Sequence, residues 1–169
     1  MPYYQSSEYN SYAGDVQRKF TPFTTPAKNN PFLHALINFN FSQLPLDRKK
    51  LSGAWKVESH QLRVITNTNE IGKPTPEGIH RDGVDFVFIY LIERKNIVGG
   101  ESIINNDDGN VLYTHTLTNP LDGIVVWDTE VFHGASPIFR QDPEQEGFRD
   151  ILLVGFSHQP NLEPPELEQ

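Results

Sequence analysis

The chain has 169 residues, which suits one domain built around a single hydrophobic core. Its 14 Lys and Arg residues against 22 Asp and Glu give a formal net charge of −8, and this balance disfavours a nucleic-acid partner because phosphate binding needs a concentrated positive surface. Cysteine is absent, so disulfides, thiolate chemistry and Cys-ligated metal sites are excluded, and any metal must be held by His and carboxylate side chains.

The sequence predicts neither a targeting segment nor a membrane span. No apolar run approaches the roughly 20 residues that a helix needs to cross a bilayer. The first residues, Met1 to Gln5, lack the basic and apolar regions of a signal peptide. We therefore expect a cytoplasmic protein that does not associate with membranes.

The N-terminal part of the chain predicts little regular structure. Residues 1–30 are polar and show no clear period, so we expect an irregular segment there. Asn30 and Pro31 are suited to cap and begin a short helix, and a second short helix is expected over residues 46–51. The folded domain is expected to span residues 31–158.

From residue 55 onward the pattern is that of short strands separated by turns. β-Branched and aromatic residues recur in runs bounded by Gly, Pro, Asn and Asp. We expect strands over residues 55–66, 84–92, 99–104, 111–117, 123–127 and 148–158. Such a series is typical of a β-sandwich, a barrel or a jelly roll. The acidic, Pro-rich tail, residues 159–169, is expected to be disordered or surface-bound.

A His-x-Asp motif, His80-Arg81-Asp82, directly precedes the strongest predicted strand. On a strand, residues two apart project from the same face, so the imidazole and the carboxylate would lie side by side. A second imidazole from a distant strand, that of His133, would complete a 2-His-1-carboxylate triad, the ligand set of non-haem Fe(II) oxygenases. Because the motif is short, the alternative is a loop histidine that is hydrogen-bonded to Asp82.

Arg149, at the start of the last predicted strand, is the candidate anchor for an acidic cosubstrate beside the metal. A guanidinium offers a carboxylate a planar, two-pronged donor. The alternative is a solvated surface arginine that pairs with Asp150. Arg140 is the rival anchor, but it lies in a polar turn.

Five elements that follow one another along the chain resemble those of a known family. They are His80-x-Asp82, Gly99-Gly100-Glu101, Gly123 to Trp127, His133 to Ile138, and Gly147-Phe148-Arg149. In this order they look like the Fe(II)/2-oxoglutarate-dependent dioxygenases. More narrowly, the stretch Glu77 to Gly83, with Trp55 and His60 to Arg63 upstream, resembles the bacterial L-isoleucine 4-hydroxylase group of free amino acid dioxygenases. The resemblance runs from about Trp55 to His158.

The resemblance implies a fold and an activity. The fold would be mainly β, a double-stranded β-helix (jelly roll) with short N-terminal helices. The activity would be hydroxylation of an aliphatic carbon of a free L-amino acid with Fe(II), 2-oxoglutarate and O2, releasing succinate and CO2. His80, Asp82 and His133 would be the catalytic iron ligands, and Arg149 would bind the far carboxylate of 2-oxoglutarate.

Two features depart from the family pattern. The resemblance implies a longer N-terminal region before the His-x-Asp motif than this chain has. Many 2-oxoglutarate enzymes also place Ser or Thr two residues after the binding arginine, and here that position is Ile151. The cosubstrate carboxylate would therefore lack that hydroxyl partner.

The substrate residues are harder to predict. A free amino acid needs a cation for its carboxylate and an acid or a carbonyl for its ammonium group. Arg63 and Glu77 are the candidates, and each has the alternative of an ordinary surface charge. Phe86, Phe88 and Trp127 either line an apolar pocket or belong to the core.

Several alternatives to the amino acid hydroxylase stay open. The same chemistry could act on another small metabolite or on a protein side chain. The chain could also be an inactive jelly roll that only holds a ligand, or a cupin-type metal enzyme without 2-oxoglutarate. The oligomeric state is open as well, with a homodimer as one alternative.

Overall fold

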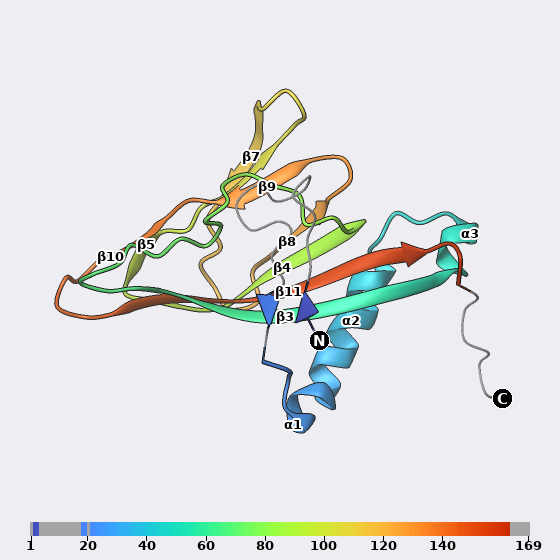
Figure 1. Cartoon of the computed structure of the whole chain (residues 1–169), viewed down its shortest axis with the longest axis horizontal. Coiled ribbons are helices and arrows are strands. Elements are labelled where there is room, and N and C mark those ends of the chain that lie inside the picture. Colours follow the sequence, from blue (N-terminus) through green and yellow to red (C-terminus); the bar gives the residue numbers. More distant parts are fainter. Residues whose placement is uncertain (1, 4–17, 20, 163–169) are drawn as a thin grey trace.

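The computed structural model describes residues 2–3, 18–19 and 21–162 (Figure 1). The expected irregular segment and the expected tail therefore lie partly outside the described residues. Within the described part, the helices are α1 (Thr25–Lys28), α2 (Pro31–Ser42) and α3 (Arg48–Leu51). Helix α1 is a single turn within the segment expected to be irregular, and α3 is the second short helix that was predicted.

Helix α2 begins where the sequence predicts. The Asn30 side chain accepts a hydrogen bond from the backbone N–H of Phe32 at 2.9 Å, and Pro31 occupies the first helical position. Asn satisfies one of the N–H groups that a helix start leaves unpaired, and proline has no N–H to leave unpaired there. These two residues therefore define the start of the helix.

The rest of the described chain is mainly antiparallel β-sheet. The strands are β1 (Pro2–Tyr3), β2 (Arg18–Lys19), β3 (Ala54–Thr66), β4 (Phe86–Lys95), β5 (Ile97–Gly99), β6 (Ser102–Asn105), β7 (Val111–His115), β8 (Gly123–Trp127), β9 (Phe132–Ala135), β10 (Ile138–Arg140) and β11 (Gly147–Gln159). A four-stranded sheet has the order β3-β11-β4-β8, and a three-stranded sheet has the order β7-β6-β9. Strands β10 and β5 pair, as do β1 and β2. The mainly β prediction is confirmed.

Four short strands were not predicted, namely β1 and β2 in the segment expected to be irregular, and β9 and β10. One predicted strand is divided. Strands β9 and β10 have four and three residues, too few for a hydrophobic period to be seen. The predicted strand over residues 99–104 breaks at Gly99 and Gly100, whose φ angles are 82° and 73°. This left-handed backbone turns the chain out of β5 before β6 begins.

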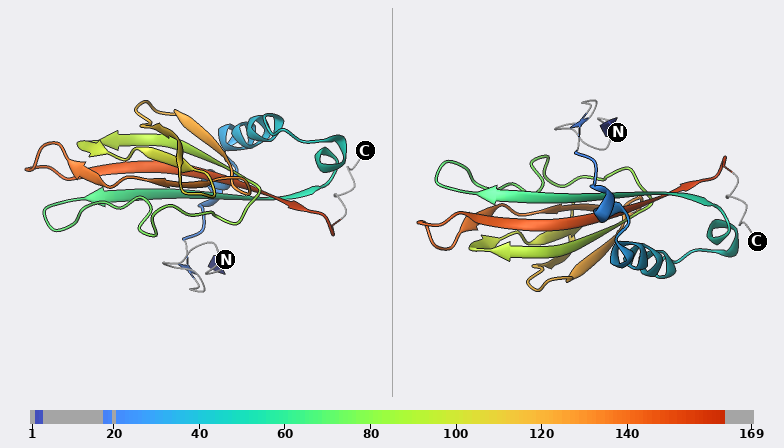
Figure 2. Two further views of the ribbon diagram at one scale, coloured as in Figure 1. Left: turned by 90° about the horizontal axis from the view of Figure 1, so that it is seen from above. Right: turned by 90° about the horizontal axis from the view of Figure 1, so that it is seen from below.

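The four-stranded sheet separates two environments. In Figure 2 its long strands run side by side, and α2 lies against one of its faces in Figure 1. On that face the core is formed by Phe86, Phe88 and Tyr90 of β4 together with Leu152, Val154 and Phe156 of β11, and apolar residues of α2 pack on them. Successive strand residues point to opposite faces, so the alternate residues of β11 face away from the helix. The candidate site lies on that opposite face.

A buried hydrogen bond joins α2 to the sheet. The Tyr90 hydroxyl donates to Oδ1 of Asn40 at 2.6 Å, and both residues are buried. Tyr90→Phe should destabilise the protein by about 1–3 kcal/mol, because a buried amide oxygen then loses its partner. Urea unfolding measures the loss. Tyr113→Phe is the control, since Tyr113 is exposed on β7 and its stability effect should be near zero; equal effects for the two variants would contradict the prediction.

Candidate metal centre

The two histidines of the predicted triad are joined through their main chains. The N–H of His80 donates to the carbonyl of His133 at 2.8 Å, and the N–H of His133 donates back at 2.9 Å. Two residues that bond each other through both main-chain N–H groups form an antiparallel hydrogen-bonded pair, and their side chains project from the same face. Their ring centroids are consequently 4.6 Å apart.

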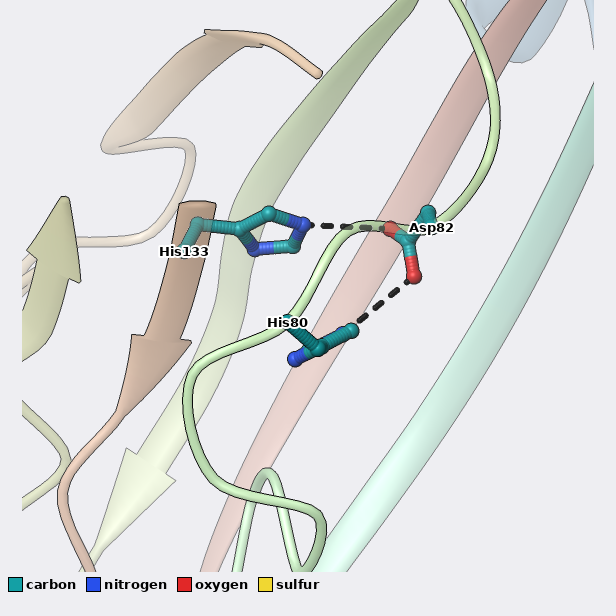
Figure 3. Close-up of side chains that lie close together, drawn as sticks. All are labelled: His80, Asp82 and His133. Atoms are coloured by element: carbon teal, nitrogen blue, oxygen red, sulfur yellow. Dashed lines mark ion pairs between the residues drawn. The ribbon is translucent and has the colours of Figure 1, made fainter. Parts of the chain in front are cut away.

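Asp82 completes the cluster (Figure 3). Its Oδ1 lies 3.3 Å from Nε2 of His80, and its Oδ2 lies 3.5 Å from Nε2 of His133. One donor atom from each of the three residues lies within 4.8 Å of the other two. Two imidazoles and one carboxylate on one side of a common point form the facial set that leaves the remaining metal positions open.

The local conformation at Asp82 differs from the expectation. His80 makes an isolated bridge to His133, but Asp82 lies in the loop before β4 and not on a strand. The two side chains converge because this loop turns, and strand alternation is not the cause. Arg81 points away from the cluster: its guanidinium binds Asp107 at 2.6 Å and stacks on the Phe132 ring at 4.1 Å.

The cluster is electrostatically coupled. Burial alone would raise the pKa of Asp82, but hydrogen bonds and positive charge from His133 and His80 lower it far below its usual range. Burial alone would lower the pKa of His133, but the carboxylates of Asp128 and Asp82 raise it to about 9. Asp82 is thus a carboxylate at every pH of interest, as a metal ligand must be.

These shifts predict how the stability of chelator-treated protein depends on pH. A histidine whose pKa rises from 6.5 to about 9 on folding contributes stability that is complete below pH 6.5 and is lost as the pH rises through 9. Urea unfolding should therefore show a loss on the order of 3 kcal/mol over this range. The His133→Asn variant should lack the loss, and a flat profile for the unmodified chain would contradict the coupling.

A cavity of about 150 Å³ adjoins the triad. The four-stranded sheet forms one wall and strands β6 and β9 form another, while Pro74 to Glu77, His80 and Asp82 complete the enclosure. Apart from the triad, the lining is mostly apolar, with Leu62, Ile89 and Leu153 among its residues. A mostly apolar cavity with a few convergent polar groups, beside a metal-ligand cluster, is typical of a small-molecule site.

Arg149 reaches the same cavity from β11. It is 2% exposed, and among the described residues its Nε and Nη2 atoms have no hydrogen-bond partner. Burial, and then the charge of Arg94, lower its pKa to about 10, so it remains a cation at neutral pH. A buried guanidinium with unsatisfied donors that faces a cavity fits a carboxylate ligand. Arg149 is therefore not a solvated surface arginine, which was the alternative interpretation.

A β-bulge brings a second arginine beside Arg149. The register between β11 and β4 shifts between Asp150 and Ile151, so Arg149 pairs with Arg94. The extra residue on β4 puts Arg94 on the face of the sheet that Arg149 occupies. The Arg94 guanidinium donates to the carbonyls of Leu117 and Gly99, which satisfies it within the protein. Of these two arginines, Arg149 is therefore the one whose guanidinium donors are available to a ligand.

The other predicted site residues divide between the cavity and the outside. Glu77 lines the cavity, with Oε1 3.5 Å from Nε2 of His80. Arg63 does not line it, because its guanidinium forms two hydrogen bonds to Asp150, at 2.7 and 2.6 Å, on the other face of the sheet. Ile151 lines the cavity and offers no hydroxyl there.

The apolar residues considered for a pocket lie elsewhere. Phe86 and Phe88 belong to the core under α2, and Trp127 is 45% exposed. Several polar residues near the site were missed: His60, Thr75 and Ser102 line the cavity, and Asp128 lies 3.3 Å from Nε2 of His133. The signal available for Asp128 was a charged residue directly after the buried-type run Gly123 to Trp127.

Two imidazoles, a carboxylate and a buried guanidinium around one cavity of a β-fold form the arrangement that is typical of facial-triad, metal-dependent oxygenases. Residues 1–155 match the family model of the 2OG-Fe dioxygenases, and the chain belongs to that family. Iron and 2-oxoglutarate are thus its cofactors, with O2 as cosubstrate. The donor sets of the cavity fit the first two, because the triad offers imidazole and carboxylate to iron and Arg149 offers a cation to the carboxylate.

Several known proteins are similar to the chain. It is 29% identical to L-isoleucine-4-hydroxylase of Bacillus thuringiensis over 92% of its own length and 65% of the relative's. It is 24% identical to 3(1)-hydroxy-L-isoleucine 4-dioxygenase of Pantoea ananatis, over 92% and 63% of the two lengths. The chain thus spans less than two thirds of these curated relatives.

Solved structures support the same fold. The crystal structure of IDO from Bacillus thuringiensis superposes with a TM-score of 0.71 at 26% identity, over 83% of this chain and 62% of that one. A bsmA homologue from Methylobium petroleophilum PM1 superposes with a TM-score of 0.77 at 30% identity, over 92% and 62%. The predicted jelly roll is confirmed. Among the described residues, no helix combines the length and apolarity that a membrane span requires.

Proposed function

We propose that this chain is an Fe(II)- and 2-oxoglutarate-dependent dioxygenase that hydroxylates an aliphatic carbon of a free L-amino acid. The observation that carries the proposal is one cavity bounded by both His80 and His133, by Asp82, and by the unsatisfied guanidinium of Arg149. The similarity to two enzymes that are named for isoleucine and hydroxyisoleucine supports the substrate class. A cytoplasmic location is part of the proposal.

Each cavity residue has a role in this proposal. His80, Asp82 and His133 would hold the iron and leave its other positions to small molecules. Arg149 would bind the far carboxylate of 2-oxoglutarate and so orient the cosubstrate toward the metal. Iron with 2-oxoglutarate supplies the oxidative chemistry when both are bound, and the protein positions the substrate carbon. The apolar wall, Leu62, Ile89 and Leu153, would exclude water and accommodate an aliphatic side chain.

Glu77 is the proposed partner for the substrate ammonium group. It lies in the cavity wall, beside His80, and the carboxylate has the sign that an ammonium group requires. Glu77→Gln should raise KM for the amino acid about tenfold or more, since a hydrogen bond to a charged group contributes about 1.5–3 kcal/mol. KM for 2-oxoglutarate should stay unchanged. Glu93→Gln is the control, because Glu93 is exposed on β4.

The activity is tested by following succinate. Protein loaded with Fe(II) and 2-oxoglutarate is supplied with O2 and with a panel of free aliphatic L-amino acids, or with short peptides that contain the same residues. Succinate formation that is coupled to one or more free amino acids is the expected result. Turnover with peptides alone would contradict the substrate class. Binding of both cofactors without oxygen consumption on any substrate would favour a ligand-binding module.

A further inference from the structure

Asp128 is a buried carboxylate that touches the metal centre without belonging to its donor set. It follows β8 directly and is 1% exposed. Its Oδ1 lies 3.3 Å from Nε2 of His133 and accepts the backbone N–H of Asp82 at 3.0 Å. Its Oδ2 accepts the N–H groups of Gly83 and Val84 at 2.8 and 3.2 Å. One side chain therefore contacts both segments that supply the triad.

The loop conformation makes this contact possible. Gly83 has a φ of 79°, a left-handed conformation that glycine adopts without strain. Such a turn directs successive backbone N–H groups toward one point, which forms a concave anion-binding nest. The nest holds the carboxylate of Asp128, and the N–H of Asp128 donates in turn to the carbonyl of Asp85 at 3.0 Å. The loop and Asp128 thus both donate hydrogen bonds to and accept hydrogen bonds from each other.

The consequence for the metal ligands is geometric. His80 and His133 are already paired through their main chains, whereas Asp82 lies in the loop between His80 and β4. The loop needs another restraint to hold the Asp82 carboxylate at its place between the imidazoles. The three N–H bonds to Asp128 supply that restraint.

We propose that Asp128 is a positioning residue that preorganises the facial triad before the metal binds. The inference rests on the proposed metal-dependent function of the same cavity. A carboxylate is needed because three backbone N–H groups point at it: an amide would present its own N–H groups to part of the nest and leave buried donors unpaired. Outer-shell partners of metal ligands typically contribute about 10–100-fold to metal affinity.

The test compares two Asp→Asn variants. Asp128→Asn disturbs the nest. Asp122→Asn disturbs a similar loop carboxylate outside the cavity, which accepts hydrogen bonds from the N–H groups of Thr118 and Asn119 at 2.9 and 2.7 Å. Each protein is titrated with Co(II), a visible stand-in for Fe(II). We expect Asp128→Asn to weaken Co(II) binding about 10–100-fold and to change the visible spectrum of the bound ion. Asp122→Asn should lose stability but keep the affinity and the spectrum.

The outcomes separate this inference from the proposed function. If the unmodified chain takes up no Co(II), the metal centre itself fails. If it does, and Asp128→Asn keeps the same affinity and spectrum, or if both variants weaken binding equally, the positioning role is overturned. Should Asp128→Asn fail to fold, Gly83→Ala strains the nest while keeping the carboxylate. It should weaken Co(II) binding and alter the spectrum in the same direction, and unchanged binding would count against the proposal.

Discussion

Asp82→Ala is expected to abolish specific iron binding and all activity. The variant removes the carboxylate that lies between the two imidazoles, 3.3 Å from His80 and 3.5 Å from His133. Two neutral imidazoles without an anionic ligand hold Fe(II) poorly, so the loss of affinity should exceed the roughly 10–100-fold that an outer-shell change causes. Titration with Fe(II) under anaerobic conditions measures the loss.

The matched control for Asp82→Ala is a nearby aspartate outside the triad. Asp107 pairs with Arg81, the residue next to Asp82, and its side chain is 75% exposed. Asp107→Ala should leave iron affinity and turnover unchanged. A similar loss in both variants would mean that the general acidity of this region, and not the triad, holds the metal.

Arg149→Met is expected to abolish 2-oxoglutarate binding and to stabilise the ligand-free protein. Methionine has a similar length but no charge and no donors. Each hydrogen bond between charged groups contributes about 1.5–3 kcal/mol, so the loss of two should weaken cosubstrate binding by more than about 100-fold. At the same time the variant relieves a buried cation that lies beside Arg94 and has unsatisfied donors. We expect a gain in stability of about 1 kcal/mol or more.

Two measurements distinguish this result from simple damage to the fold. Calorimetric titration of 2-oxoglutarate into metal-loaded protein reports binding, and urea unfolding of ligand-free protein reports stability. A damaged variant loses both, whereas the anchor role predicts opposite signs. Arg63→Met is the control, because Arg63 binds Asp150 on the other face of the sheet and should not affect the cosubstrate. Retained 2-oxoglutarate binding in Arg149→Met would exclude the anchor role.

The long strands were predictable because each carries a β-branched or aromatic run that no helix period fits. Strands β4 and β11 are the clearest cases, and they form the centre of the larger sheet. Strands β9 and β10 were not found, because three or four residues carry no readable period. Their pairing depends on distant segments, β6 and β5, which local sequence does not reveal.

The triad was predictable from residue types and their order, but the reason for its convergence was not. His80, Asp82 and His133 come together as expected, yet Asp82 is placed by a loop that Asp128 holds. The nest that holds Asp128 leaves little pattern in the sequence, since its partners are backbone N–H groups that every residue except proline carries. Arg63 was assigned to the substrate because the polar and apolar residues of β3 alternate only roughly, so the face of each side chain was ambiguous.

The main-chain pairing of His80 with His133 has a consequence for redesign. The distance between these two positions depends on backbone hydrogen bonds of 2.8 and 2.9 Å and not on the imidazoles themselves. A His133→Gly substitution therefore leaves an opening of defined shape in an unmoved frame, which free imidazole from solution can fill. The metal ligands can in this way be replaced one at a time, because the backbone that carries them stays in place.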